Sequence, residues 1–262
     1  MFTANDIKYY ASLKQKKIRE TERKFLIEGK HLVEECLSST YRIEILLVDD
    51  SSFNDKSLLS KAGSENIKIE KISPAQLKKI SDTETPQGII GIVNMKRPPK
   101  LSYDEMDLVI ALDAINDPGN LGTILRTAFW YGVDHILLGI GSVDIFNSKV
   151  IRASQGAVFK TNFITNMPLL NELKNLHSAG FNIYALTTHT NKPLNQTKLG
   201  QRSVFVFGNE AGGISEDILK SGYENVKIDA YSKCDSLNVA VSVGVVLDRY
   251  RHFLSEAKDL II

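Results

Sequence analysis

The sequence of 262 residues contains little cysteine and no apolar run long enough to cross a membrane. Its two cysteines, Cys36 and Cys234, allow at most one disulfide, and neither lies beside histidine or cysteine residues at zinc-ligand spacing. The N-terminus lacks the charged-then-apolar order of a signal peptide, and a membrane span needs about 18 or more apolar residues. We therefore expect a cytoplasmic protein with no membrane segment and no metal centre.

Several common ligand-binding signatures are also missing. Gly139 and Gly141 follow a strand-like run, but no third glycine completes the dinucleotide-binding pattern GxGxxG. No GxxxxGK[ST] sequence is present, which argues against the usual phosphate-binding loop. The five histidines are scattered, and no serine, histidine and acidic residue stand out as a catalytic triad.

The composition is that of an ordinary globular protein. Hydrophobic residues make up 43% and charged residues 24% of the chain, which excludes a disordered or low-complexity protein. The length favours two modest domains over one. Pro98 and Pro99, with flanking charges, interrupt any regular element, so we expect a first domain at 1–97, a linker at 98–105 and a second domain at 106–262.

The apolar pattern predicts an α/β protein in both domains. In the first, it indicates a helix at 30–37 and strands at 43–48, 67–72 and 88–93. In the second, continuous apolar runs at 107–112, 135–139, 182–187, 203–208 and 225–228 indicate a parallel sheet covered by helices on both faces. Residues 236–250 are apolar almost all round, so we expect a helix buried within its domain or against another subunit.

A basic segment lies near the N-terminus: residues 8–24 contain seven basic and two acidic side chains. Residues 1–100 contain 18 Lys and Arg against 14 Asp and Glu, whereas residues 101–262 contain 14 against 17. Basic side chains bind nucleic-acid phosphates by releasing counterions, although the same pattern is typical of a solvated helix face. If the segment binds RNA, its candidate contacts are Lys14, Lys16, Lys17, Arg19 and Arg23.

Ligands of parallel α/β sheets usually bind at loops beyond the carboxyl ends of the strands. The loop after 107–112 leads into a helix at which Asn120 is either the N-cap or a ligand group. Arg126 lies among apolar neighbours in this helix, so it either extends to solvent or is held at a site.

Two later loops carry further polar residues. Glu210 lies in a turn whose glycines permit either close approach to a ligand or a tight strand-to-helix connection. Ser236 and Asn238 open the apolar C-terminal helix. Ser236 is either its N-cap or a site residue, whereas Asn238, placed inside the first turn, favours a site because an unpaired polar group is costly to bury.

Three segments resemble, in order and separation, the signature motifs of the SpoU (TrmH) branch of the SPOUT RNA methyltransferases. They are NDPGNLGTILRTA (motif one), FVFGNEAGGIS (motif two) and IDAYSKCDSLNVAVSV (motif three). The similarity covers residues 107–254 and includes NSKVIRASQGAVFK at 147–160. Residues 5–95 resemble the N-terminal RNA-binding domain of the same family.

The resemblance implies both a fold and a reaction. The fold is an L30e-like α/β domain for RNA substrate binding at 1–97, followed by a SPOUT α/β catalytic domain at 106–262 with a parallel sheet and a deep trefoil knot. The reaction is transfer of a methyl group from S-adenosylmethionine to a ribose 2′-hydroxyl of rRNA or tRNA, without a metal. Catalytic domains of this family pair near the knot, which implies a homodimer.

The resemblance also implies the site residues. Five polar residues match the family's catalytic positions: Asn120, Arg126, Glu210, Ser236 and Asn238. Six residues match its cofactor-binding positions: Leu186, Thr187, Gly208, Asn209, Ile228 and Leu237. Motif three departs from the family pattern at Asp229, Ala230, Ser232 and Ala240, in place of Pro, Met, Gly and Ser. Main-chain contacts survive such changes, but we expect altered cofactor affinity.

In this interpretation the difficult step is deprotonation and alignment of the ribose hydroxyl. A guanidinium with a pKa of about 12 or more is a poor base, so we expect Arg126 to hold the target phosphate and stabilise the developing alkoxide. Asn120 would position Arg126 or the ribose, and Glu210 would orient the guanidinium. Two rival hypotheses are a non-catalytic RNA-binding protein that retains the fold and a base methyltransferase. The sequence does not identify the RNA or the nucleotide.

Overall fold

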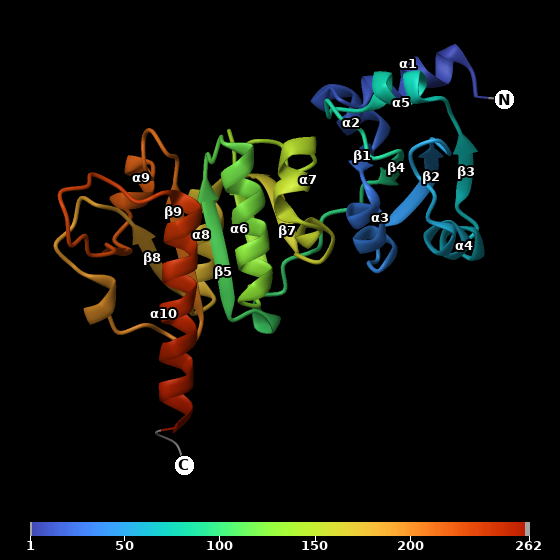
Figure 1. Cartoon of the computed structure of the whole chain (residues 1–262). Helices are drawn as coiled ribbons and strands as arrows, with labels where there is room; N and C mark the ends of the chain where they lie inside the picture. The colour runs from blue at the N-terminus through green and yellow to red at the C-terminus, as the bar shows by residue number, and fades with distance from the viewer. Residues whose placement is uncertain (1, 260–262) are drawn as a thin grey trace. The chain divides into compact units, whose positions relative to one another are not determined.

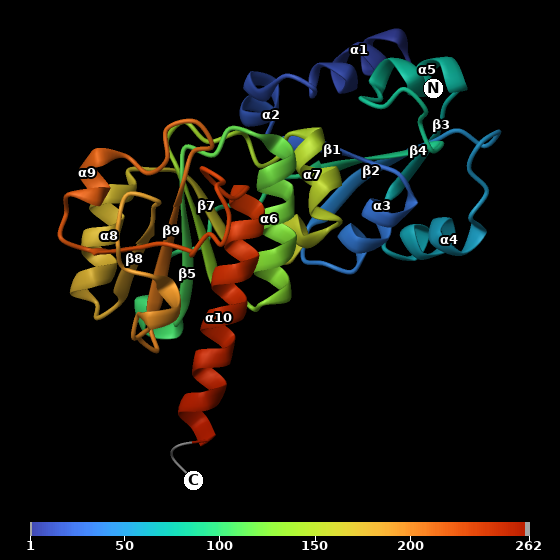
Figure 2. The ribbon, with the colours of Figure 1, turned by 60° about the vertical axis from the view of Figure 1, so that its left-hand side comes forward.

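The computed structural model describes residues 2–259, and the chain divides into two compact units (Figures 1 and 2). The first unit comprises Met1–Arg97 and Phe146–Lys160, and the second comprises Pro98–Ile145 and Thr161–Ile262. The expected second domain at 106–262 includes residues 146–160, whereas their contacts place these residues in the first unit.

The first unit is built around a four-stranded sheet in the order β1-β4-β2-β3. Strands β2 and β3 are parallel, and the other pairs are antiparallel. Its elements are α1 (Ala4–Ser12), α2 (Lys16–Glu22), β1 (Lys24–Glu28), α3 (Lys30–Leu37), β2 (Arg42–Val48), α4 (Lys56–Ser64), β3 (Lys68–Lys71), α5 (Pro74–Ile80), β4 (Ile89–Asn94), α7 (Ser148–Ser154) and the short 3-10 helix η2 (Ala157–Phe159). The expected helix at 30–37 and the three expected strands correspond to α3, β2, β3 and β4.

Aromatic packing explains why residues 146–160 belong to the first unit. Phe25 on β1 is fully buried, and its ring centroid lies 4.5 Å from that of Phe146 and 6.5 Å from that of Phe159. Tyr41 packs edge-on against Phe159 at 5.5 Å. At the end of the segment Lys160 forms an ion pair of 2.5 Å with a carboxylate of α3. The segment therefore completes the core of a unit that is otherwise N-terminal.

The second unit contains a six-stranded parallel sheet in the order β10-β8-β9-β5-β6-β7. Its elements are η1 (Tyr103–Glu105), β5 (Leu108–Asp113), α6 (Pro118–Trp130), β6 (His135–Gly139), β7 (Phe163–Met167), α8 (Leu169–Ser178), β8 (Asn182–Leu186), η3 (Leu194–Gln196), β9 (Ser203–Gly208), α9 (Glu216–Leu219), β10 (Glu224–Val226) and α10 (Val239–Asp259). The parallel sheet expected from the apolar runs is confirmed.

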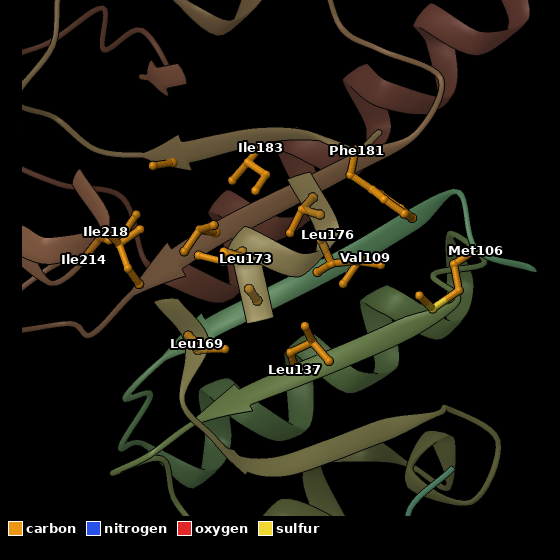
Figure 3. Packing of buried hydrophobic residues seen from close by; sticks show 14 residues of the cluster. Met106, Val109, Leu137, Leu169, Leu173, Leu176, Phe181, Ile183, Ile214 and Ile218 are labelled. Carbon is orange, nitrogen blue, oxygen red and sulfur yellow. The ribbon is translucent and has the colours of Figure 1, made fainter. Parts of the chain in front are cut away.

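Helices cover both faces of this sheet. On one face, Leu169, Leu173 and Leu176 of α8 pack on Val109 and Leu137 of the strands (Figure 3). Side chains alternate along a strand, so the intervening residues of β5 face the other side, where α6 and α10 lie against each other (Figures 1 and 2). Both faces are therefore apolar, which is why the strands read as continuous apolar runs.

Helix α10 is only half covered within the chain. Val243, Val246, Leu247 and Tyr250 are buried, but Val241 and Val245 are 51% and 41% exposed. Of the two expected alternatives, burial within the domain is therefore incomplete, and burial against another subunit stays a prediction. Among the described residues, no helix has the length and apolar character needed to cross a membrane.

We predict that Phe25→Ala strongly destabilises the protein. Removing a fully buried ring that packs against Phe146 and Phe159 leaves a cavity, which costs about 3–5 kcal/mol of unfolding free energy. Urea denaturation measures this change, and Phe25→Leu serves as a control because it retains most of the apolar volume. Wild-type stability of the alanine variant would show that residues 146–160 do not depend on β1.

Candidate functional site

The loop after β5 holds Asn120 at the start of α6. The N-cap of this helix is Asp117, whose carboxylate accepts a hydrogen bond of 2.7 Å from the Asn120 main-chain N–H. Pro118 occupies the first helical position, where its missing N–H is tolerated. Asn120 is therefore not the N-cap, which was one of its two expected roles. Its side chain is free to bond outside the helix.

The Asn120 side chain joins residues from all three motifs. Its Nδ2 donates to Oε1 of Glu210 over 2.8 Å, and its Oδ1 accepts from Nδ2 of Asn238 over 3.0 Å. We call these three residues the amide chain. Glu210 and Asn238 are 90 and 118 residues from Asn120 in the sequence, so only the fold brings them together. These two hydrogen bonds link the three loops to one another.

Asn238 has a second role at the start of α10. Its Oδ1 accepts hydrogen bonds from the main-chain N–H groups of Ala240 at 2.9 Å and Val241 at 3.3 Å. Asn238 therefore caps the helix from just outside it. The sequence predicts a position inside the first turn, which is wrong. Ser236 is exposed and is not the N-cap. Its main-chain carbonyl accepts from the thiol of Cys234 over 3.3 Å.

The loop after β9 is a tight connection braced by Asn209. The side chain of Asn209 donates to the Ala114 carbonyl at 2.6 Å and accepts from the Ala211 N–H at 2.8 Å. A Cβ added to Gly208 would lie 2.0 Å from the carbonyl carbon of Gly213, so only glycine fits at this position. The side chain of Asn209 therefore ties the loop after β9 to the loop after β5, and Glu210 follows it beside Asn120.

Main-chain groups of motif three are available to a ligand. Leu186 on β8 pairs with Val226 on β10, and the Thr187 N–H donates to the Val226 carbonyl at 2.9 Å. Beyond β10, Ile228 and Leu237 form no backbone–backbone hydrogen bond within the described part of the chain. The expected cofactor residues therefore lie at or beyond the carboxyl ends of three neighbouring strands, β9, β8 and β10.

Arg126 lies apart from the amide chain. It follows Asn120 by six residues on α6, a rise of about 9 Å along the helix axis. Its side chain is exposed and has no hydrogen bond or ion pair within residues 2–259. Phe129 and Trp130, three and four residues further on, share its helix face and are 46% and 83% exposed. Glu210, expected to orient the Arg126 guanidinium, bonds to Asn120 instead.

The basic residues of the first unit differ in accessibility. Arg19 is 5% exposed, and its Nη1 donates to the Leu13 and Lys14 carbonyls at 2.9 and 2.6 Å, so it stabilises the turn between α1 and α2. Lys14 donates to the Ser81 carbonyl at 2.6 Å. The exposed side chains are Lys16, Lys17 and Arg23. Because the Arg19 guanidinium is buried, it cannot bind a phosphate.

Two acidic residues with clear roles were not singled out from the sequence. Asp113, at the end of β5, accepts from the Ser215 N–H at 2.8 Å and so ties the strand before motif one to the last residue of motif two. Asp117 caps α6, and an aspartate directly before a proline at the start of an apolar-periodic segment is the signal that identifies such a cap. Both residues support the site without contributing a free polar group.

The two cysteine thiols differ in burial. Burial raises the pKa of the Cys36 thiol to about 12, so it stays protonated and unreactive. Cys234 is exposed in the loop of motif three. The described residues contain no group of three or more His, Cys, Asp or Glu side chains that could hold a metal ion.

Comparison with known proteins agrees with this geometry. A model of the SpoU rRNA Methylase family matches residues 107–248, and one of the MRM3-like substrate binding domain matches residues 4–91. The chain is 32% identical over 247 residues to the 23S rRNA (guanosine(2553)-2′-O)-methyltransferase RlmP of Bacillus subtilis, which covers 94% of this chain and 95% of that relative.

Solved structures match both units of the chain. An AdoMet-bound rRNA methyltransferase from Sinorhizobium meliloti has a TM-score of 0.84 at 25% identity, covering 97% of each chain. An RNA 2′-O ribose methyltransferase has a TM-score of 0.79 at 27% identity, again covering 97% of each chain. With its three motifs joined by the amide chain and the family model spanning more than half of its length, this chain belongs to the SpoU rRNA methylase family.

Proposed function

We propose that this protein transfers a methyl group from S-adenosylmethionine to a ribose 2′-hydroxyl of rRNA. The observation that carries the proposal is the amide chain, which unites Asn120, Glu210 and Asn238 from the three family motifs at one edge of the sheet. The named activity of the Bacillus subtilis relative supports a guanosine of 23S rRNA as the target. A non-catalytic RNA-binding protein would have no need to keep all three polar residues in one network.

The main chain of motifs two and three suits the cofactor. Gly208 holds the loop after β9 in a conformation that a side chain would disrupt, and the Ile228 and Leu237 main-chain groups lie outside the sheet and helix ladders. Such groups recognise an adenine without particular side chains, so the substitutions at Asp229, Ala230, Ser232 and Ala240 leave the proposed contacts intact. When bound, S-adenosylmethionine supplies a methyl group attached to a sulfonium leaving group.

The chain's own residues must then orient and deprotonate the ribose hydroxyl. We assign Arg126 to the phosphate of the target nucleotide and to the negative charge that develops on the 2′-oxygen, because a guanidinium offers several donors in one plane. The proton leaves to phosphate or water. Glu210 and Asn238 keep Asn120 in place, and Asn120 keeps the first turn of α6 against the loops that hold the cofactor.

The first unit is proposed to capture the RNA. The match to the MRM3-like substrate binding domain supports this assignment, and the accessible cations Lys16, Lys17 and Arg23 are its proposed phosphate contacts. Arg19 is left out of this set because it is buried. The L30e-like character of this unit, the trefoil knot of the second and a cytoplasmic location are retained as predictions from the family resemblance.

A homodimer is proposed through the uncovered face of α6 and α10. Trp130 on α6 and Val241 and Val245 on α10 are exposed apolar residues, and the two helices pack against each other. Exposed apolar residues on two packed helices favour a protein–protein interface, and identical subunits most often pair about a two-fold axis. Arg126 lies on the same face of α6, so pairing would bring it to the interface.

The cofactor proposal predicts that substitutions at two nearby glycines have different effects on cofactor affinity. Gly208→Ala should raise the Kd for S-adenosylmethionine more than about tenfold, because the new Cβ collides with the main chain at Gly213. Gly212→Ala is the control, since no heavy atom lies within 4 Å of its added Cβ. Calorimetric titration measures both, with circular dichroism to check folding. Equal affinities of the Gly208→Ala and Gly212→Ala variants for S-adenosylmethionine would show that the cofactor does not bind at this loop.

The reaction proposal predicts that Arg126→Lys lowers kcat by about 10²–10³-fold with little change in cofactor Kd, because lysine keeps the charge but loses the planar set of donors. Transfer of labelled methyl to a 23S rRNA transcript measures kcat. A matched transcript with a 2′-deoxy nucleotide at the target should accept no methyl group yet still bind. Methylation of the deoxy transcript would instead indicate a base atom.

The dimer proposal predicts a mass of about twice 29.2 kDa by light scattering. Val245→Arg places a charge on the uncovered face of α10 and should give monomers, because a buried unpaired charge is unfavourable. Ile140→Arg is the matched control: Ile140 is also an exposed apolar residue but lies after β6, away from the proposed interface. A wild-type monomer, or a dimer that tolerates Val245→Arg but not Ile140→Arg, would contradict the assignment.

A further inference from the structure

The loop between β10 and α10 carries one aromatic side chain that projects into solvent. Tyr231 is 94% exposed, a larger fraction than any other exposed large hydrophobic side chain in the described part of the chain. Its hydroxyl has no hydrogen bond and its ring no aromatic neighbour within residues 2–259. Packing within the chain therefore does not account for an aromatic residue at this position.

Both ends of this loop are held in place. At its start, the Lys227 N–H donates to the Lys192 carbonyl at 3.0 Å, and Pro193 bridges to Lys227. At its end, Asn238 bonds to Asn120. Tyr231 follows Ile228 by three residues, which span at most about 10 Å of chain. The ring is therefore confined to the neighbourhood of the proposed methyl-transfer site.

The charge of the loop distinguishes two ways of contacting RNA. Residues 229–235 contain Asp229 and Asp235 against Lys233, a net charge of −1. Such a loop does not attract phosphate groups. A nucleobase, in contrast, stacks on an aromatic ring through its π-face whatever the local charge, and unpaired bases of RNA are commonly bound in this way.

We propose that Tyr231 stacks on a nucleobase next to the methylated ribose and so helps to select the target nucleotide. This inference rests on the proposed function, because RNA must approach the loop that carries Ile228, Ser236 and Asn238 for the methyl group to be transferred. Stacking would cover a ring that is now in solvent and would hold the neighbouring ribose against the site. Tyr231 thus adds a contact to substrate in a loop otherwise assigned to the cofactor.

The test compares three full-length variants on an unmodified 23S rRNA transcript. Tyr231→Phe keeps the ring, Tyr231→Leu keeps an apolar side chain without a planar face, and Tyr231→Ala removes both. Fluorescence anisotropy gives the RNA Kd, transfer of labelled methyl gives KM and kcat, and calorimetry gives the Kd for S-adenosylmethionine. We expect the leucine and alanine variants to raise the RNA Kd and KM by about 5- to 150-fold, the range for loss of one stacked base. The phenylalanine variant should match wild type, with cofactor affinity unchanged in all three.

Other outcomes overturn the proposal in distinct ways. If the cofactor Kd rises while RNA binding is unchanged, the ring covers the cofactor. If Tyr231→Leu binds RNA as tightly as Tyr231→Phe does, the contact is apolar packing without base stacking. If all variants bind RNA as wild type does, Tyr231 makes no substrate contact. A wild-type enzyme that binds the transcript without methylating it contradicts the proposed reaction, whereas the binding comparison still decides the role of Tyr231.

Discussion

The hydrogen bond between Asn120 and Asn238 is the constraint on which the candidate site depends. The loops after β5 and β9 begin side by side, because Asp113 pairs with Gly208 at the ends of these neighbouring strands. Motif three leaves the sheet from β10, which pairs with β8 and not with β5. Its polar residues reach motif one only because α10 lies along α6, and the bond of 3.0 Å fixes the start of one helix to the start of the other.

The C-terminal end of α6 is joined to the middle of α10 as well. The guanidinium of Arg251 on α10 donates to the Tyr131 carbonyl through Nε at 2.7 Å and to the Gly132 carbonyl through Nη2 at 2.7 Å. These carbonyls lie at the C-terminus of α6, where the helix itself offers no donor. Helices α6 and α10 therefore run in the same direction, and α6 is tied to α10 at both of its ends. Small shifts at the interface of the helices would move Asn238 relative to Asn120.

The sequence was sufficient to predict the strands, the parallel sheet and the three loops, because each depends on residues near one another in the chain. It did not predict residues 146–160 correctly, since the stacking of Phe146 on Phe25 joins positions 121 residues apart. The sequence left the helix caps open because several polar residues precede each helix. The aspartate before Pro118 is a local signal for one cap, whereas backbone geometry is needed to select Asn238 for the other. An apolar pattern on all sides of α10 likewise did not show which face would remain exposed.

The partner of Glu210 shows how structure changes the chemical interpretation. Had Glu210 paired with Arg126, as the sequence suggested, the carboxylate would have neutralised the guanidinium and occupied its donors. In the structure the Glu210 carboxylate instead accepts a hydrogen bond from the neutral side-chain amide of Asn120. Arg126 keeps its positive charge and its donors in solvent, on a helix whose first turn is fixed by the amide chain. This separation suits the proposed reaction, because the groups that define the site are held rigid while the one cation assigned to phosphate and alkoxide remains available to the RNA.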